Sequence, residues 1–397
     1  MGDKSKVIVC DNGTGFVKCG FAGDNFPRHK FPAVVGRPIL RFEETDGSSS
    51  NLQSIMCGDE ADKCRSSLEL SWPVSNAIIK DYPDMIHLWD YTFHEKLGVP
   101  RTAGAFNDYR ILLTEPPLNP MDNRKKMLET MFEHYGFGGV SVQIQAVLTL
   151  YGQGIVTGVV VDSGDGVTHM VPVFEAQCIP HQIRRMNLAG HDITEYLIKL
   201  LFLRGYSFNR TADFDTVRQI KESLCYVGVD LELEKKLALE TTVLDEVYEL
   251  PDKTKITVGS ERFEASEAIF KPQLVDKEGM GMSEMLFDLI NSCPMDLRKA
   301  FYSHVVLSGG TTMLAGLPSR LEKDIRDMYR EKILQGSEAD MKRFPLKIED
   351  PPARKTLVFA GGSIFASLLM ENPSGWITKQ EWQEGFSEAM MHKMGCL

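Results

Sequence analysis

The same strand-and-turn pattern occurs twice in this sequence, and this repeat limits what the chain can fold into. A β-rich run at 7–10 leads into Asp11-Asn12-Gly13-Thr14-Gly15, and a run at 158–161 leads into Asp162-Ser163-Gly164-Asp165-Gly166. A second β-rich run follows each turn, which is the pattern of a β-hairpin. With the first copy placed on the second, 151 residues later, the aspartates and glycines coincide and Lys18 falls on His169. The chain is therefore predicted to be duplicated.

Helical patterns fill the sequence between and after these hairpins. Apolar residues recur at helical spacing in 123–135, 143–151, 191–203 and 214–227. Two later segments, 305–312 and 357–363, are predicted to run from a strand through a double-glycine turn into a helix. Strands alternating with helices, in two copies, predict an α/β protein with two similar lobes.

The composition argues against several kinds of partner. The 397 residues include 44 Lys and Arg against 55 Asp and Glu, a net charge of −11, with no run of five basic residues. We therefore expect no nucleic-acid partner and no membrane-binding surface. The uncharged stretch 356–370 is shorter than the ~20 residues of a membrane span, so no membrane insertion is expected. Eight cysteines without a C-x-x-C pair, and no secretory signal, predict reduced thiols in a cytoplasmic chain.

The two glycine turns have the composition of phosphate-binding loops. Glycine adopts positive φ, so consecutive backbone N–H groups can converge on an anion. Asp11 and Asp162 each end a strand and are candidates to hold Mg²⁺, which takes oxygen ligands, keeps several waters and bridges to phosphates. Lys18, on the return strand, can neutralise phosphate charge. One such turn alone is more often only a tight hairpin, whereas two equivalent copies favour a polyphosphate held from both sides.

These residues resemble the actin, Hsp70 and sugar-kinase superfamily, and the similarity to actins covers nearly the whole chain. The two hairpins are similar to its phosphate hairpins, and Gly309-Gly310-Thr311-Thr312 is similar to its adenosine motif. The strings similar to actins are Phe21-Ala22-Gly23-Asp24, Val35-Gly36-Arg37-Pro38, Leu113-Thr114-Glu115-Pro116-Pro117-Leu118-Asn119-Pro120, Ile144-Gln145-Ala146-Val147-Leu148 and Arg204-Gly205-Tyr206-Ser207-Phe208. Strings that resemble an actin-related branch instead of conventional actin include Leu88-Trp89-Asp90-Tyr91-Thr92-Phe93, Asn209-Arg210-Thr211-Ala212-Asp213-Phe214 and Lys347-Ile348-Glu349-Asp350-Pro351-Pro352.

The resemblance implies a site for ATP or ADP with Mg²⁺, the metal being held by Asp11 and Asp162. It makes Gln145 and His169 the pair that orders the water attacking the γ-phosphate, a step that depends on in-line geometry and charge stabilisation. The remaining positions implied to bind the nucleotide are Gly13, Thr14, Gly15 and Lys18 in the first loop, Gly164, Asp165 and Gly166 in the second, and Lys221, Glu222, Gly309, Gly310, Thr311 and Lys355 around the nucleoside.

The resemblance also implies an organisation and a function. The outer lobe would comprise 1–151 and 346–397, with a peripheral insertion at about 33–72, and the inner lobe 152–345, with one at about 190–280. The expected function is that of an ATP-binding subunit, a slow ATPase at most, in a hetero-oligomeric complex that nucleates branched actin filaments. Its partners would be the other subunits, actin and nucleation-promoting factors of the cytoplasmic actin cytoskeleton. Alternatives are an actin paralogue that polymerises itself and a sugar-kinase-like phosphotransferase, although no sugar-binding motif is found; 350–397 is too short for an Hsp70 peptide-binding domain.

Three departures from the actin pattern concern the coupling of the Asn76 loop to the nucleotide cleft and the assembly of subunits. Asn76 and His191 stand where actins usually carry histidine and arginine, respectively. The segment 41–54 is polar and unlike the actin loop that inserts into the next subunit, since 42–50 holds three acids and three serines.

The methionines Met390, Met391 and Met394 near the end are expected to pack instead of binding a metal.

Overall fold

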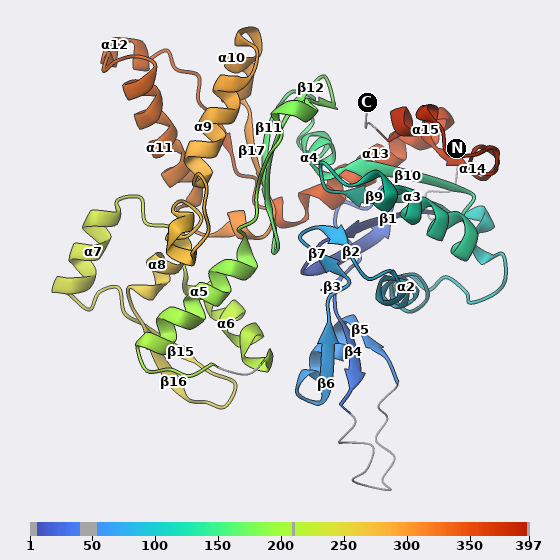
Figure 1. Ribbon diagram of the computed structural model, residues 1–397, viewed down its shortest axis with the longest axis horizontal. Helices are drawn as coiled ribbons and strands as arrows, with labels where there is room; N and C mark the ends of the chain where they lie inside the picture. Colours follow the sequence, from blue (N-terminus) through green and yellow to red (C-terminus); the bar gives the residue numbers. More distant parts are fainter. Residues whose placement is uncertain (1–5, 40–53, 209–210, 395–397) are drawn as a thin grey trace, which may run out of the picture. The chain divides into compact units, whose positions relative to one another are not determined.

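The computed structural model describes residues 6–39, 54–208 and 211–394. Two compact units make up the chain, the first comprising Met1–Thr157, Val173–His181 and Lys355–Leu397, and the second Gly158–Pro172 and Gln182–Arg354. Both units combine strands with helices (Figure 1), which confirms the predicted α/β class. Apart from Ser54, the polar segment 41–54 lies outside the described residues.

The first unit is built on a six-stranded sheet with the order β19-β10-β9-β1-β2-β3. The central strand β1 is buried at every position, as expected of a strand covered on both faces. It pairs antiparallel with β2 and parallel with β9, and β9 pairs parallel with β10. The strand bounds are β1 Val7–Asn12, β2 Phe16–Phe21, β3 His29–Pro32, β9 Arg110–Glu115, β10 Gly139–Ile144 and β19 Ile377–Thr378.

A small sheet and several helices complete the first unit. The small sheet has the order β5-β4-β6 and is followed in the chain by the short pair β7 and β8. The bounds are β4 Val35–Pro38, β5 Met56–Cys57, β6 Leu68–Ser71, β7 Val74–Ser75, β8 Ile78–Ile79, β13 Gln177–Cys178, α1 Gly58–Lys63, α2 Tyr82–Asp90, α3 Met121–Glu129, α4 Gln145–Gln153, α13 Leu357–Glu371, α14 Lys379–Glu384 and α15 Glu388–Lys393.

The second unit repeats the strand order of the first. Its sheet runs β12-β11-β17-β18, so that a hairpin is again followed by neighbouring strands. The β11–β17 and β17–β18 pairs are parallel, as are β1–β9 and β9–β10. The predicted duplication is therefore present in the topology. The strand bounds are β11 Gly158–Ser163, β12 Thr168–Phe174, β14 Arg184–Met186, β15 Glu246–Glu249, β16 Lys255–Val258, β17 Val305–Ser308 and β18 Ile348–Glu349.

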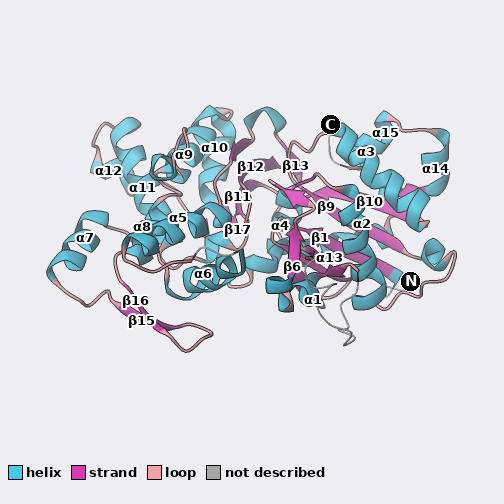
Figure 2. Cartoon of the chain, turned by 60° about the horizontal axis from the view of Figure 1, so that its bottom comes forward, coloured by secondary structure: helices cyan, strands magenta, loops and turns pink. Residues whose placement is uncertain are grey.

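Helices are prominent in the second unit (Figure 2). The predicted helix at 191–203 is confirmed as α5, and the one at 214–227 corresponds to α6, which ends three residues earlier. In the first unit, the helix predicted at 143–151 begins at Gln145 because 143–144 belong to β10. No described helix is both long and apolar enough to cross a membrane. The helix bounds are α5 Gly190–Leu203, α6 Thr211–Leu224, α7 Leu231–Glu240, α8 Glu261–Glu267, α9 Met282–Ser292, α10 Met295–Ser303, α11 Leu317–Lys332 and α12 Glu338–Met341.

The strand predicted at the start of 357–363 is wrong, because this segment is the first half of helix α13. Its large apolar residues pack in the core with Val9, Leu112 and Leu148, so tertiary burial overrides local β propensity. The double glycine serves helix packing instead of a turn. A Cβ at Gly361 would lie 1.7 Å from the carbonyl oxygen of Leu148 on α4, so only glycine permits α4 and α13 to approach this closely.

The C-terminal helices close the core of the first unit. Met390 and Met394 are buried in the same apolar cluster as Phe93 and Phe137, which confirms that these methionines pack. The Lys393 ammonium pairs with Glu381 at 2.6 Å, and the Lys393 carbonyl accepts a hydrogen bond from Gln143 on β10. The end of the described chain is therefore fixed to the central sheet by packing and by polar contacts.

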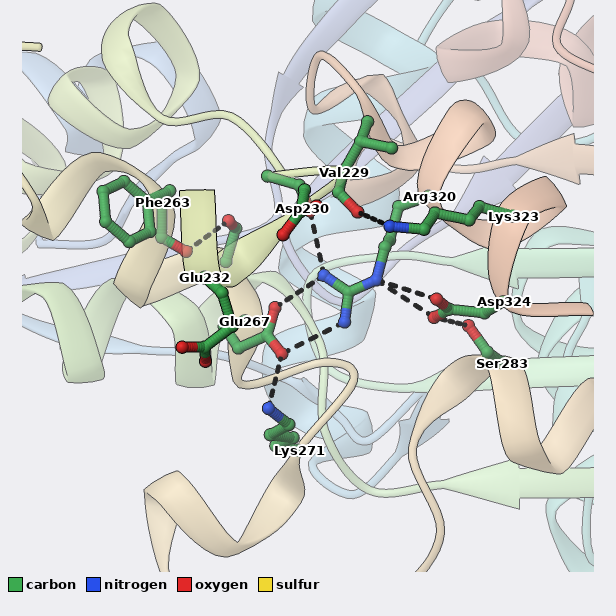
Figure 3. A network of polar contacts seen from close by, with 12 residues as sticks. Val229, Asp230, Glu232, Phe263, Glu267, Lys271, Ser283, Arg320, Lys323 and Asp324 are labelled. Atoms are coloured by element: carbon green, nitrogen blue, oxygen red, sulfur yellow. Dashed lines mark hydrogen bonds and ion pairs between the residues drawn. The ribbon is translucent and has the colours of Figure 1, made fainter. Parts of the chain in front are cut away.

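A buried ion network joins α11 to α8 in the second unit (Figure 3). The Arg320 guanidinium pairs with Glu267 at 3.0 Å and with Asp324 at 3.0 Å, and it also donates to the carbonyl of Gly228 at 2.9 Å. Ser283 on α9 donates to Asp324. Glu267 is only 3% exposed, and its carboxylate is compensated by Arg320 and by the half-exposed Lys271, which lies 3.3 Å away.

Replacing Arg320 with methionine is expected to destabilise the protein by about 3 kcal/mol, because it leaves the buried Glu267 carboxylate with only the half-exposed Lys271 as an ion partner among the described residues. Arg326→Met on the same helix breaks a half-exposed pair with Glu322 and should change stability by less than about 1 kcal/mol. Thermal and urea unfolding of the two variants measures the difference. Equal melting temperatures for both variants would contradict the assigned role of Arg320.

Candidate functional site

The first half of the candidate site is organised around the carboxylate of Asp11, which ends β1 and is 2% exposed. Asp11 and Lys18 are cross-strand partners in the β1–β2 hairpin, and the Lys18 ammonium lies 2.8 Å from Asp11 Oδ2. Thr114, on the neighbouring parallel strand β9, donates to Asp11 Oδ1 at 2.6 Å. The hairpin register and the parallel pairing therefore bring a cation and a hydroxyl to one buried carboxylate.

Gln145 joins this cluster from the first residue of α4. Its side-chain amide donates to Asp11 Oδ1 at 3.2 Å and to Thr114 Oγ1 at 3.4 Å. β9 and β10 are parallel, and α4 follows β10 directly, so Gln145 lies at the carboxyl edge of the sheet. This edge is where α/β sheets bind ligands. The predicted residues Asp11, Lys18 and Gln145 are thus brought together.

The turn that follows Asp11 is held in a narrow loop. Gly13 N–H donates to the Phe16 carbonyl at 3.1 Å, and a Cβ on Gly13 would lie 2.8 Å from that oxygen. Gly15 accepts from Ala33 N–H. The Thr14 hydroxyl accepts a hydrogen bond from Ala77 N–H at 3.0 Å. The loop therefore requires glycine at position 13 and connects through Thr14 to the β7–β8 turn.

That β7–β8 turn contains Asn76, one of the departures from the actin pattern. Asn76 has φ 52° and Ala77 has φ 63°, so both residues are in the left-handed region. Asparagine enters this region more readily than most residues, whereas alanine does so at a cost. Asparagine at position 76 thus suits this turn, which places Ala77 N–H against Thr14 in the glycine loop after Asp11.

The second half of the site repeats the turn on the other hairpin. Asp162 pairs in register with Ser308 near the ends of β11 and β17, and Gly164 N–H donates to the Val167 carbonyl at 3.1 Å. Gly309 has φ 90°, and a Cβ there would lie 2.2 Å from the Ser163 carbonyl and 2.8 Å from an Asp162 carboxylate oxygen. Only glycine allows the backbone after β17 to approach the Asp162 turn this closely.

The predicted nucleoside residues of this unit lie around the start of α5. The Thr311 hydroxyl donates to the Gly164 carbonyl at 2.5 Å. The Lys221 ammonium donates to the Gly190 carbonyl at 2.6 Å and to Thr194 Oγ1 at 2.9 Å, and burial lowers its pKa. A Cβ on Gly190 would lie 2.7 Å from Thr311 Oγ1 and 3.3 Å from Lys221 Nζ, so these groups form one cluster with the second turn.

The other predicted residues take different positions. The backbone carbonyl of Asp165 accepts from His191 N–H at 2.8 Å, which connects the second turn to α5. Glu222 accepts from Arg218 at 3.0 Å on α6. Gly310 accepts from Met313 N–H at 3.2 Å in the turn after β17, and Gly166 is half-buried in the second hairpin turn. Lys355 belongs to the first unit, in the short helical segment before α13.

His169 presents a buried nitrogen without a protein partner. The residue is 2% exposed on β12, and its Nε2 makes no hydrogen bond with the described residues. Burial, together with the charge of its cross-strand neighbour Arg185, lowers the pKa of His169 to about 4. The imidazole is therefore neutral at neutral pH, and its Nε2 is suited to a hydrogen bond with a ligand or a water molecule.

Thr114 is the residue of the first half-site that was not assigned from the sequence. It lies in the string Leu113-Thr114-Glu115-Pro116 at the carboxyl end of a parallel strand, and that position was the available signal. Thr194 and Gly190, the partners of Lys221, had no local signal. Their contact joins residues about thirty positions apart and depends on the packing of α5 against α6.

The fold and the paired turns define an α/β protein in which a hairpin with a glycine turn occurs twice. Comparison with known proteins gives its family. A family model described as actin matches residues 2–394, and the chain belongs to the actin family. Among its relatives are proteins named actin-related protein 2, from Acanthamoeba castellanii at 58% identity over 97% of each chain, Saccharomyces cerevisiae at 54% over 98%, and Drosophila melanogaster at 53% over 95%. These findings confirm the predicted family and the similarity to its actin-related branch.

The residues present fit a magnesium nucleotide. Gly13 and Gly309 permit close approach of backbone within the two turns, and Asn12 Nδ2 and His169 Nε2 are buried polar atoms for which the described residues supply no hydrogen-bond partner. Asp11 already accepts from Lys18, Thr114 and Gln145, whereas a carboxylate offers about four acceptor positions. Asp11 therefore suits contact with the hydration shell of Mg²⁺ better than multiple direct contacts with the ion.

The depressed pKa of His169 predicts a pH dependence of stability. Its pKa is about 4 in the native protein against an ordinary 6.5 in the unfolded chain. The stability that the neutral imidazole gives the native state is therefore fully present above pH 6.5 and is lost as the pH falls toward 4. Between about pH 7.5 and about pH 6.0, His169 should account for a loss of about 1 kcal/mol of unfolding free energy. Urea unfolding at both pH values, with His169→Gln as the comparison, measures this loss. An identical pH dependence for the two proteins would contradict the assignment.

Proposed function

We propose that the chain is an ATP-binding actin-like subunit of a hetero-oligomeric complex that nucleates branched actin filaments, resembling the actin-related protein 2/3 complex. Similarity to proteins named actin-related protein 2 over at least 95% of the chain supports this proposal. The equivalent turns after Asp11 and Asp162 support the nucleotide part. ATP binding and slow hydrolysis would act as a conformational switch.

Residues of both half-sites would contribute to binding the nucleotide. Backbone N–H groups of the two turns would contact the phosphates, and Lys18 would lie near them, charge-compensated by Asp11. Asp11 and Asp162 would hold Mg²⁺, which neutralises phosphate charge when bound. Gly309, Gly310, Thr311, Lys221, Glu222 and Lys355 would surround the nucleoside.

Gln145 and His169 would position the attacking water. The neutral His169 imidazole has an unpartnered Nε2 that can bind a water molecule. The Gln145 amide is oriented by Asp11 and Thr114, so its carbonyl oxygen remains available to accept a hydrogen bond. Both groups orient water without being part of the backbone surfaces proposed to bind phosphate. Binding and hydrolysis can therefore be separated by mutation.

Asp11→Ala and Asp162→Ala are each expected to weaken Mg-ATP binding, because each removes a negative charge that holds the hydrated metal against the phosphates. Calorimetric titration with Mg-ATP measures the change. Asp108→Ala, which alters an exposed pair with Lys6, serves as the control and should bind as tightly as the natural chain. Unchanged affinity in both site variants would refute the metal assignment.

His169→Ala and Gln145→Ala should retain ATP binding but slow hydrolysis by a factor on the order of 10²–10⁴, the range for positioned proton-transfer and water-orienting groups. Single-turnover hydrolysis with saturating Mg-ATP measures the rate, and calorimetry checks binding in the same preparations. Lost affinity combined with normal turnover would be the opposite of what these roles require.

The proposed partners are the other subunits of the complex, actin and nucleation-promoting factors in the cytoplasmic actin cytoskeleton. An incoming actin subunit would meet the face near Tyr151 and the Cys396 tail, of which Cys396 lies outside the described residues. The Tyr151 ring lies 5.2 Å from the Phe365 ring on α13, where Ile364 and Leu368 are about half exposed. The other filament face would depend on 42–50, whose acids oppose burial in an interface core. One compatible face and one altered face suit a filament starter held by partners.

The purified chain is therefore expected not to form long filaments alone in Mg-ATP, because a head-to-tail contact needs two matching faces on one subunit. High-speed pelleting and electron microscopy test this, with native mass of the complex from the source cells as the companion measurement. A mass several times 44.6 kDa is expected there. Long filaments of the isolated chain would favour the alternative of a self-polymerising paralogue.

A further inference from the structure

In the second unit, α7 is the most exposed of the α-helices whose side chains are all described. None of its ten residues is buried. Leu233, Leu237 and Leu239 are 55%, 37% and 88% exposed, although leucine normally stabilises a helix by packing. A helix of this length is marginal in water without tertiary contacts. Its exposed leucines therefore indicate a surface that is completed by another molecule.

The chain enters α7 from a fixed position. Arg320 donates to the Gly228 carbonyl. Lys323 donates to the Val229 carbonyl at 3.1 Å (Figure 3). Asp230 then caps the helix by accepting from Leu233 N–H. The buried ion network thus holds the start of α7, while the rest of the helix presents its side chains to solvent.

A groove of about 830 Å³ lies between α7, the following loop 241–245 and α8. Phe263 of α8 is buried along it, whereas Leu239 and Val243 are 88% and 78% exposed. Small-molecule pockets enclose most of the ligand surface. These two side chains instead project outward, which suits contact with an apolar face of a polypeptide.

The charge around this groove is negative. Residues 231–249 carry six acids against two lysines, a net charge of −4. Arg204, which also lines the groove, is compensated by Glu261 at 2.8 Å and Asp245 at 3.6 Å. Glu240 at the end of α7 and Glu246 and Glu249 on β15 add further negative charge, so acids outnumber basic groups around the groove. A complementary partner must bring positive charge beside its apolar side chains.

We propose that this α7 groove binds an amphipathic basic segment of another protein, with apolar side chains on one face and Lys or Arg beside them. Leu239 and Val243 contact the apolar face, and the acids of 231–249 attract the basic side chains. This inference goes beyond the proposed function, because it requires neither nucleotide nor assembly of the complex.

Fluorescence anisotropy of the full chain with a labelled helical peptide of about 14 residues, leucine on one face and lysine on the other, tests the proposal. The double variant Leu239→Asn/Val243→Thr removes apolar contact without changing charge, and it should weaken binding at least ~10-fold relative to the natural chain. Raising the salt from about 50 mM to about 300 mM should also weaken binding. A leucine–glutamate peptide of the same length should not bind.

Met295→Asn is the matched control, since Met295 is 82% exposed in the same unit and does not line the groove. It should leave peptide affinity unchanged, and thermal unfolding verifies that all variants fold. Equal affinity for the natural chain and the double variant, or equal binding of the acidic peptide, would overturn the proposal. So would a dimer of the chain in sedimentation that the double variant abolishes, because the occupant would then be a second copy.

Discussion

The geometry of the first half-site depends on one buried carboxylate. Asp11 accepts from Lys18 on β2, Thr114 on β9 and Gln145 on α4, so one side chain joins three elements that are distant in the sequence. A buried charge of this kind is tolerated only when it is paired and hydrogen-bonded. The arrangement therefore orients Gln145 and positions Lys18 at the same time, and the loss of any partner alters the others.

The sequence permitted the hairpins, the duplication and the α/β class to be predicted, because periodicity and glycine turns are local signals. Asp11 and Lys18 could both be assigned to the first hairpin from its glycine turn, whereas their ion pair was not predicted. The strand predicted at 357–360 failed because burial against β1, β9 and α4 outweighed local propensity. Thr114 and Thr194 escaped assignment for a related reason, since their roles arise from contacts between elements far apart in the chain.

The two halves of the candidate site contribute different chemistry. In the first unit, Asp11 accepts from three donors, so both oxygens of its carboxylate are hydrogen-bonded. In the second unit, His169 is held neutral and has an unpartnered nitrogen. A duplicated scaffold has thus placed a cation at one copy of a hairpin position and a neutral base at the other. Divergence at this single repeated position gives one unit a charge-compensating lysine and the other a neutral imidazole.

The contact between Gly361 and the Leu148 carbonyl has a consequence for how mutations in this chain should be interpreted. It packs α13 tightly against α4, and Gln145 is the first residue of α4. The position of Gln145 therefore depends on Gly361, a residue more than two hundred positions further along the chain. A bulkier residue at 361 would force α4 away from α13 and displace Gln145, so a substitution in the core of this unit would disturb the hydrogen bonds of the Asp11 cluster.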